Sequence, residues 1–322
     1  MIGQALGLIG IALRYFSVRN CIRNPMSTIA PENKIALSNH FARGYSKILD
    51  SEANVDCNIV ELFLKMDRYA EAQTAMELDK FITYTTFDNI GTAFFSEPFG
   101  FIRAGHDIGR TLKNNIALSK GRRRTSLFRA IQSFIYHMIQ HPEAWSKVRS
   151  EIDTAQARGL CLDPVITFND AEQLPYFKAC VKEALRIFSP TTMGLPRVVP
   201  KNGITIAGRL FREGTILSIS PYVVHSSKEI WGADAQVWNP ERWISGDSKD
   251  LERNWLVFSA GYMMCLGRHF AKMQISKIAA SLVRDYDIRQ VDPKNIWDYQ
   301  ANFTALTHSW PVYVKKRKLL QK

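Results

Sequence analysis

The sequence feature that most constrains this chain is Cys265, which is set between two glycines immediately before a helix-forming run. The stretch reads Phe258-Ser-Ala-Gly-Tyr-Met-Met-Cys-Leu-Gly267 and continues as Arg268-His-Phe-Ala-Lys-Met-Gln-Ile-Ser-Lys277. Gly261 and Gly267 allow a sharp turn and a close approach of the backbone to a flat partner that a Cβ would obstruct. The N–H groups and the positive end of the predicted helix point back at the sulfur. They favour the thiolate, which is the form that binds metals.

A lone cysteine also has a simpler interpretation, as a small buried hydrophobic side chain, and its residue type alone leaves that alternative open. The other four cysteines are scattered along the chain without paired spacing: Cys21, Cys57, Cys161 and Cys180. This pattern argues against a disulfide framework or a zinc ribbon and suits a reducing compartment.

Two further motifs precede the cysteine loop along the chain. Glu183-Ala-Leu-Arg186 lies in a predicted helix, and Pro240-Glu-Arg-Trp243 lies in a predicted loop. Each motif is weak alone. Together with Phe-x-x-Gly-x-x-x-Cys-x-Gly, in this order, they make the chain resemble the cytochrome P450 family of haem-thiolate monooxygenases, of the fungal secondary-metabolism type. The resemblance is continuous from about Ser126 to the C-terminus and patchy before that residue.

The resemblance implies a mainly α fold with a small late β-sheet (α+β), incomplete in its N-terminal half relative to complete family members. We expect one P450-like domain overall. It consists of a shortened helical part with a short apolar N-terminal segment over residues 1–120 and a C-terminal haem-thiolate half over residues 121–322. A chain of 322 residues with 46% hydrophobic content can bury a core of this size.

Hydrophobic periodicity predicts the helices and strands. An N-capping box is predicted at Asn169 and Glu172, ahead of a helix that starts at Pro175. A turn at residues 212–214 is expected between two strands. The predicted helices cover residues 55–69, 78–95, 127–139, 143–157 and 175–188, and the predicted strands cover residues 204–208, 215–220 and 310–314.

The resemblance also implies a cofactor and the residues that hold it. The cofactor is haem b, with the Cys265 thiolate as the axial ligand of the iron. Phe258 is expected beside the thiolate, and Gly261 and Gly267 are expected to permit close approach to the porphyrin. Arg197 matches a position where relatives place a guanidinium on a haem propionate, and bidentate pairing explains that preference.

Glu183 and Arg186 have two interpretations. Helical periodicity places them opposite the apolar face of their helix, where they would form a surface ion pair worth about 0.2–0.5 kcal/mol. The resemblance instead implies a buried triad with Arg242 that locks the loop leading to the cysteine.

The chain departs from the family pattern where oxygen is activated. Aligned backwards from Pro142, that element falls on Arg122-Arg-Arg-Thr125-Ser126-Leu127. Ser126 stands at the proton-relay hydroxyl, but Thr125 replaces the acid and arginines replace small residues. Met263 also replaces a basic residue two positions before the cysteine. Because O–O cleavage needs acid delivery of protons, we expect a weak or inactive member with Thr125 and Ser126 as a degenerate catalytic element.

Two segments correspond to those that usually line the substrate pocket in the family, although simple loop packing is an equal alternative for both. The residue types alone do not define a ligand. The expected pocket residues are Thr191, Thr192, Met193, Leu195, Thr304 and Leu306.

The net charge of +12 is compatible with nucleic acid, an anionic membrane surface or an acidic protein partner. No nucleic-acid motif accompanies the charge, so nucleic acid is not expected. The resemblance implies an NADPH-dependent flavoprotein reductase and a small lipophilic substrate. Residues 1–16 are too short to span a bilayer comfortably, and they suit either a membrane-surface segment or a buried helix. The implied location is the cytosolic face of the endoplasmic reticulum membrane, with the cytosol as the alternative.

A second function remains open for a chain with these departures. It would be a non-catalytic haem-binding or partner-binding remnant, such as the product of a pseudogene or of mis-splicing. The segment Ser119–Leu127 discriminates between the two, because a conventional acid–threonine helix encoded there would favour the enzyme.

Overall fold

The computed structural model describes residues 52–110, 127–191, 194, 196–245, 248–261, 264–294, 299–301, 305–307 and 310–317. Several predicted residues lie outside these ranges: the segment 1–16, Thr125, Ser126, Thr192, Met193, Leu195, Met263 and Thr304. For Leu306 the structure describes the backbone only.

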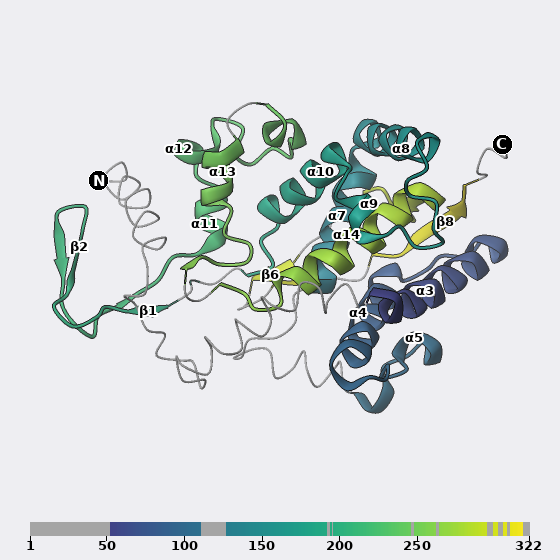
Figure 1. The fold of residues 1–322 in the computed structure, drawn as a ribbon, viewed down its shortest axis with the longest axis horizontal. Coiled ribbons are helices and arrows are strands. Elements are labelled where there is room, and N and C mark those ends of the chain that lie inside the picture. The colour runs from purple at the N-terminus through teal and green to yellow at the C-terminus, as the bar shows by residue number, and fades with distance from the viewer. Residues whose placement is uncertain are drawn as a thin grey trace.

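Helices make up most of the described chain, and the longer ones pack around one large core (Figure 1), with two small clusters beside it. The longer helices are α3 (Glu52–Ala72), α4 (Leu78–Phe95), α7 (Leu127–Gln140), α8 (Pro142–Ala157), α10 (Pro175–Ile187) and α14 (Arg268–Asp285). The shorter ones are α5 (Phe101–Ala104), η1 (Ile108–Arg110), α9 (Phe168–Ala171), α11 (Pro221–His225), α12 (Lys228–Trp231), η2 (Pro240–Trp243) and α13 (Ser248–Asn254).

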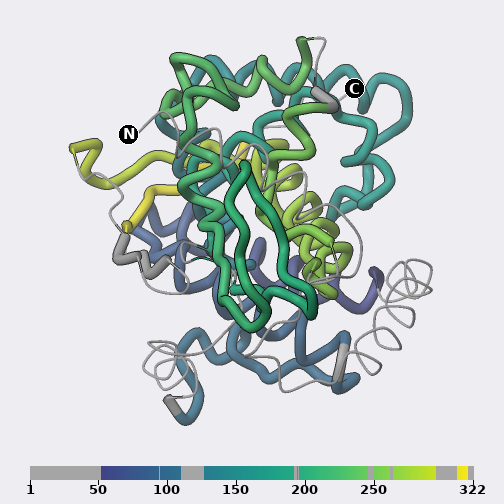
Figure 2. Tube along the Cα trace, turned by 90° about the vertical axis from the view of Figure 1, so that its left-hand side faces the viewer, coloured from purple at the N-terminus to yellow at the C-terminus, as the bar shows by residue number. Residues whose placement is uncertain are grey.

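The described strands form four separate antiparallel pairs. The hairpin of β2 and β3 projects from the body of the molecule, as Figures 1 and 2 show. The pairs are β1 (Arg197–Val198) with β4 (Ile216–Leu217), β2 (Ile204–Ile206) with β3 (Arg209–Phe211), β5 (Tyr286–Gln290) with β8 (Val312–Lys316), and β6 (Tyr299–Ala301) with β7 (Ala305–Thr307). The mainly α fold with a small late β component is confirmed.

The predicted amphipathic helices form because their apolar positions recur every three or four residues. In α3, the five predicted core positions are all buried: Val55, Ile59, Leu62, Phe63 and Met66. Helix α8 begins with Pro142 in its first turn, where the missing N–H has no intrahelical partner to lose. Among the helices that the structure describes, none is both long and apolar enough to cross a bilayer.

The predicted capping box at Asn169 and Glu172 is wrong. Thr167 caps the short helix α9 instead, by accepting a hydrogen bond from the Asp170 N–H. Helix α10 has no side-chain cap of its own, and the N–H groups of Tyr176 and Phe177 donate to the Glu151 carboxylate of α8 at 2.8 and 2.9 Å. The cap therefore comes from another helix, which a local pattern cannot reveal.

The two predicted middle strands do not pair with each other. Ile204–Ile206 pairs with Arg209–Phe211, through a tight turn at Ala207 and Gly208 with φ of 48° and 78°. Two consecutive left-handed residues match the right-handed twist of a two-residue hairpin. Strand β4 pairs instead with β1, which brings Arg197 opposite Leu217.

One carboxylate in the core gives a pH-dependent prediction. Asp79 lies in the first turn of α4, is 9% exposed, and has no hydrogen-bond partner for Oδ1 among the described residues. Burial, followed by the charge of Glu77, raises the pKa of Asp79 from 3.8 to about 6. A raised folded-state pKa means that ionised Asp79 destabilises the fold at neutral pH, and this cost disappears as the pH falls from about 6 to below 4.

We expect Asp79→Asn to raise the free energy of unfolding at pH 7.5 by up to about 3 kcal/mol, as urea denaturation at that pH would measure. The same comparison at pH 4 should show almost no difference, because the native carboxyl is then already protonated. An equal gain at both pH values would attribute the effect to packing of the amide.

Candidate functional site

Cys265 lies on the loop that leads into α14, two residues before the helix N-cap Gly267. Its backbone N–H donates to the Phe258 carbonyl oxygen at 2.8 Å, and the Met264 N–H donates to the Gly261 carbonyl oxygen at 3.0 Å. The residue is exposed, whereas Cys161 and Cys180 are buried. The interpretation of Cys265 as a buried hydrophobic side chain is therefore wrong, and that interpretation suits the other two.

Different physical reasons explain why a glycine stands at each of these two positions of the loop. Gly261 has a φ of 64°, in the left-handed region that favours glycine. Gly267 has a φ of −82°, which any residue adopts, and a Cβ added there would meet nothing within 4 Å. Nothing in the described chain requires a glycine at 267. Its place beside Cys265 is consistent with the close approach of a flat group that a side chain would obstruct.

A row of aromatic rings connects the cysteine loop to the Pro-Glu-Arg-Trp segment. Phe258 contacts Trp255 with ring centroids 5.8 Å apart, and Trp255 contacts Trp243 at 6.3 Å. Trp243 in turn contacts Trp231 at 5.5 Å. The Trp255 Nε1–H donates to the Lys182 carbonyl oxygen on α10 at 3.1 Å, so the row is also fixed to the helix that carries Glu183.

The structure brings Glu183, Arg186 and Arg242 together at one carboxylate. Arg186 donates to both oxygens of Glu183, at 2.8 Å from Nε and 2.7 Å from Nη2, and Arg242 Nε donates to Oε1 at 2.9 Å. Asn239 N–H and Trp243 Nε1–H complete the set at 3.0 and 2.9 Å. Glu183 and Arg186 are fully buried, so the surface ion-pair interpretation is wrong.

The remaining N–H donors of the two arginines form hydrogen bonds to the segment between residues 225 and 237. Arg186 Nη1 donates to the carbonyl oxygens of His225 and Ala235, at 2.7 and 2.5 Å. Arg242 Nη2 donates to the Asp234 carboxylate at 2.9 Å. These guanidiniums are buried without large cost because nearly all of their donors have partners.

The structure also places Arg197 beside the cysteine loop. Arg197 is 4% exposed, and its Nη2 donates to the Ser259 hydroxyl at 3.2 Å, next to Phe258. Of the predicted pocket residues, Thr191 lies just beyond the end of α10, and its carbonyl oxygen accepts a hydrogen bond from the Ser189 hydroxyl at 2.9 Å. Asp234, Asn239 and Ser259 also take part in these contacts, and none of them belongs to a motif that would have predicted its role.

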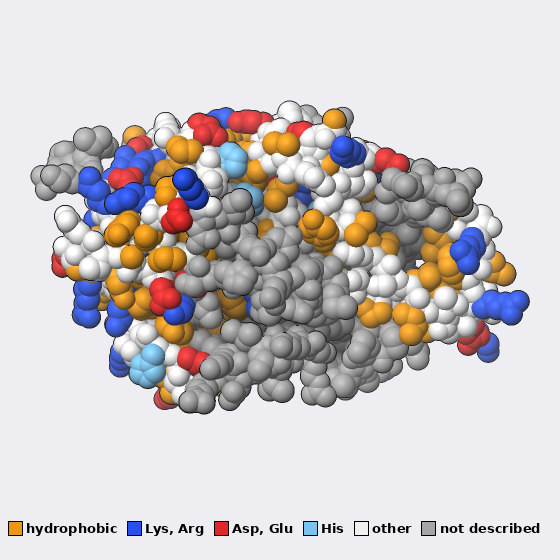
Figure 3. Space-filling view, turned by 180° about the vertical axis from the view of Figure 1, so that it is seen from behind, with side chains coloured by type: hydrophobic (Ala, Val, Ile, Leu, Met, Phe, Trp, Pro, Cys, Tyr) orange, Lys and Arg blue, Asp and Glu red, His pale blue; other side chains and the backbone are white. Residues whose placement is uncertain are grey.

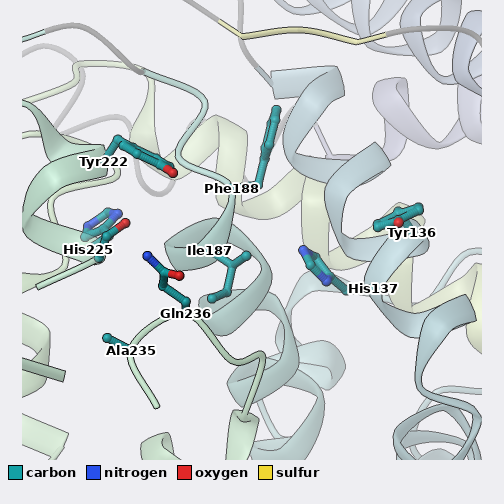
Figure 4. Close-up of a pocket in the computed structure, with 9 residues that line it drawn as sticks. Tyr136, His137, Ile187, Phe188, Tyr222, His225, Ala235 and Gln236 are labelled. Carbon is teal, nitrogen blue, oxygen red and sulfur yellow. The ribbon is translucent and has the colours of Figure 1, made fainter. Parts of the chain in front are cut away.

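A cavity of about 290 Å³ lies between α7, the end of α10, and α11 (Figure 4). His137 of α7 and His225 of α11 contribute imidazoles to its wall, and burial lowers the pKa of each to about 3. His225 Nε2 accepts from the Leu256 N–H at 2.9 Å, which fixes its tautomer and ties α11 to the segment before the cysteine loop. Both rings are therefore neutral structural groups near pH 7.

On the face shown in Figure 3, groups of lysine and arginine side chains lie apart, with acidic and hydrophobic side chains between them. Among the described residues, no group of three or more His, Cys, Asp and Glu is arranged to hold a metal ion.

The sequence model of the cytochrome P450 family matches residues 125–315, a stretch that contains the cysteine loop, the Glu183 cluster and Arg197. The chain belongs to the cytochrome P450 family. This family binds haem through a cysteine thiolate to the iron.

Relatives of this P450 chain are fungal monooxygenases. It is 33% identical to cytochrome P450 monooxygenase cicH of Emericella nidulans over 189 residues, which is 58% of this chain and 38% of cicH. It is 36% identical to a cytochrome P450 monooxygenase of Aspergillus terreus over 177 residues, which is 54% of this chain and 35% of that relative. The matched stretch thus spans little more than a third of the length of either relative.

A third P450 relative aligns over more of the chain. Cytochrome P450 monooxygenase pkfB of Emericella nidulans is 29% identical over 368 aligned positions, which cover 84% of this chain and 70% of pkfB. Because 368 positions exceed the 322 residues of the chain, pkfB contains residues within the aligned range that this chain lacks. The length difference is therefore partly internal.

The residues around Cys265 fit the haem of this family. The exposed sulfur supplies the soft anionic ligand, Gly267 leaves room for a flat macrocycle, and the buried guanidinium of Arg197 offers a cation for a carboxylate. Bound haem with a thiolate ligand supplies the chemistry of O2 activation.

Proposed function

We propose that this chain is a haem-thiolate protein of the monooxygenase type whose oxygen-activating element is degraded, so that it turns over weakly or not at all. The observation that carries the proposal is the exposed Cys265, held in a braced glycine loop at the start of α14. The family reaction is O2-dependent oxidation of a small lipophilic molecule. The fungal monooxygenase relatives favour a secondary metabolite as its substrate.

Within this proposal each residue has a distinct role. The Cys265 thiolate ligates the iron, Phe258 shields the sulfur, and Arg197 pairs with a propionate. Glu183, with Arg186 and Arg242, positions the cysteine loop and does not touch the reacting atoms. Thr191 and the neighbouring predicted pocket residues contribute to the substrate side.

Loss of activity is proposed from the sequence of the oxygen-activating segment. Thr125 stands where the family has an acid, and Ser126 is the one hydroxyl left at the proton-relay position. A hydroxyl without an adjacent acid has no ready source of protons. The bulky Arg122, Arg123 and Arg124 also replace the small residues that leave space for O2.

An optical spectrum of the full chain tests the haem-thiolate assignment. Reconstituted with haem, reduced and exposed to carbon monoxide, the protein should show the strongly red-shifted Soret band of a thiolate-ligated carbonyl complex. Cys265→Ala should abolish this band, because it removes the sulfur. Cys57→Ala is the matched control, since Cys57 is another exposed cysteine on α3 and its loss should leave the band unchanged.

Haem uptake without the shifted band, or a band that survives in Cys265→Ala, would overturn the assignment. Weak turnover is tested separately: with NADPH and a flavoprotein reductase, the loaded protein should form little or no product. Robust reductase-dependent product formation would contradict the proposed inactivity while keeping the haem assignment.

A non-catalytic haem-binding or partner-binding remnant is the second candidate function, favoured by the lost acid at Thr125. The proposed partners of an active form are an NADPH-dependent flavoprotein reductase and a lipophilic substrate, at the cytosolic face of the endoplasmic reticulum membrane or in the cytosol. The apolar segment 1–16 would mediate any association with the membrane surface.

A further inference from the structure

A second cavity, of about 330 Å³, is lined by residues of α10 and α14 and of the segment that precedes the cysteine loop. These two helices lie alongside each other (Figure 1). Helix α10 contributes Lys178, Val181, Lys182 and Leu185, which are spaced as one stripe of a helix. The cavity is therefore built on rigid elements.

The opposite wall comes from α14 and from the segment before the cysteine. Helix α14 contributes Lys272, Ile275 and Ser276, which also share one face. Trp255 and Phe258 supply aromatic surface, and the hydrogen bond from the indole to the Lys182 carbonyl oxygen fixes the Trp255 ring. Apolar and aromatic side chains thus share the lining of this cavity with five charged side chains.

The charges in this cavity leave one cation in excess. Its lining has three lysines and two glutamates. Lys178 pairs with Glu172 at 3.7 Å, and Lys182 pairs with Glu252 at 2.5 Å. Among the residues that the structure describes, no carboxylate forms an ion pair with Lys272. Desolvation lowers the pKa of Lys272, and the charges of Lys182 and Arg268 add to this effect, while the charges of Glu172 and Glu252 oppose it.

We infer that this cavity binds an organic monoanion with an apolar body, such as a medium-chain carboxylate, whose charged end pairs with Lys272. The apolar end packs against Trp255, Phe258 and the aliphatic side chains of α10. Cys265 is not among the residues that line this cavity, and the proposed binding does not depend on haem.

Occupancy of the cavity is also linked to the cysteine loop. Phe258 lines the cavity with its side chain and accepts the Cys265 N–H with its carbonyl oxygen. A ligand that packs on Phe258 therefore holds the segment that positions the sulfur. The cavity is a candidate effector site for the loop.

Calorimetric titration of the full chain with octanoate, alongside octylamine of the same length, tests the inference. We expect saturable binding of octanoate and none of octylamine, with a change in Trp255 fluorescence that is absent in Trp255→Phe. Lys272→Met should weaken octanoate binding at least tenfold. Lys228→Met, an exposed lysine on α12 away from the cavity, should leave binding unchanged.

Because Lys272 is exposed at the edge of the cavity, its replacement should leave the melting temperature unchanged, so that weakened binding reports the lost charge. No octanoate binding, equal binding of octylamine, or unchanged binding in Lys272→Met would each overturn the inference. A chain that binds octanoate but shows no thiolate band would retain this site and contradict the proposed haem ligation.

Discussion

Replacing Glu183 by alanine is expected to destabilise the protein by about 3–5 kcal/mol, because it leaves two buried guanidiniums without their shared anion. The Glu183 carboxylate accepts five hydrogen bonds from four residues: Arg186, Asn239, Arg242 and Trp243. Because Glu183 is fully buried on α10, most of these donors would lose their acceptor, although Arg242 would keep its bond to the Asp234 carboxylate. Urea denaturation followed by circular dichroism would measure the loss, and Glu183→Gln should recover only part of it.

The matched control for Glu183 lies in the same Pro-Glu-Arg-Trp segment. Glu241 pairs with Lys147 at the surface, and both side chains are 53% exposed. Glu241→Ala should therefore change stability by less than about 1 kcal/mol. If the two substitutions had equal effects, the buried carboxylate would not be the group that holds this segment in place.

The reduced carbonyl spectrum of Glu183→Ala should also lose its thiolate band, because the cysteine loop is then no longer held in place by the Glu183 cluster.

Lys277 is the second position where a single change should have a large effect. Its ammonium group is fully buried on α14 and pairs with Glu52 at 2.5 Å and Asp56 at 2.9 Å on α3. Glu52 also accepts the Phe168 N–H at 2.8 Å, so one cation connects α3, α9 and α14. Lys277→Met keeps the length of the side chain but leaves two carboxylates unpaired, and we expect a loss of about 3 kcal/mol.

The control for Lys277 is Lys316→Met, which removes a pair with Asp67 from a lysine that is 60% exposed. That change should cost less than about 1 kcal/mol in the same denaturation experiment. Burial raises the pKa of Asp56, so adding Asp56→Asn to Lys277→Met should restore part of the stability. Full additivity of the two substitutions would contradict their coupling.

The helices of this chain could be predicted from sequence because their apolar positions repeat with the helical period. Helix α4 was predicted with both of its ends, and α7 and α8 are divided at His141 and Pro142 as expected. The predicted capping box failed because the actual cap depends on a contact between residues that are distant in sequence. Glu151 caps α10 from another helix, and no pattern near Pro175 indicates this contact.

The residues of the candidate site also fall into two groups, those that could be predicted from sequence and those that could not. The family motifs predicted that Glu183, Arg186 and Arg242 would meet, whereas helical periodicity alone predicted a surface pair. Periodicity failed because it records the apolar face of α10 and cannot see that the segment 225–243 covers the other face. Asp234, Asn239 and Ser259 could not be predicted at all, since their contacts depend on how that covering segment runs.

The Glu183 cluster also bears on the order in which the molecule folds. Glu183 and Arg242 are 59 residues apart along the chain, and joining them closes a loop whose entropic cost is on the order of 4 kcal/mol. A single hydrogen bond does not offset that cost, so we expect the donors to reach the carboxylate together. Helices such as α7 and α8 rely on local contacts and can form earlier. The cysteine loop, which follows the closed segment, should therefore acquire its native shape among the last events of refolding, after the helical core is in place.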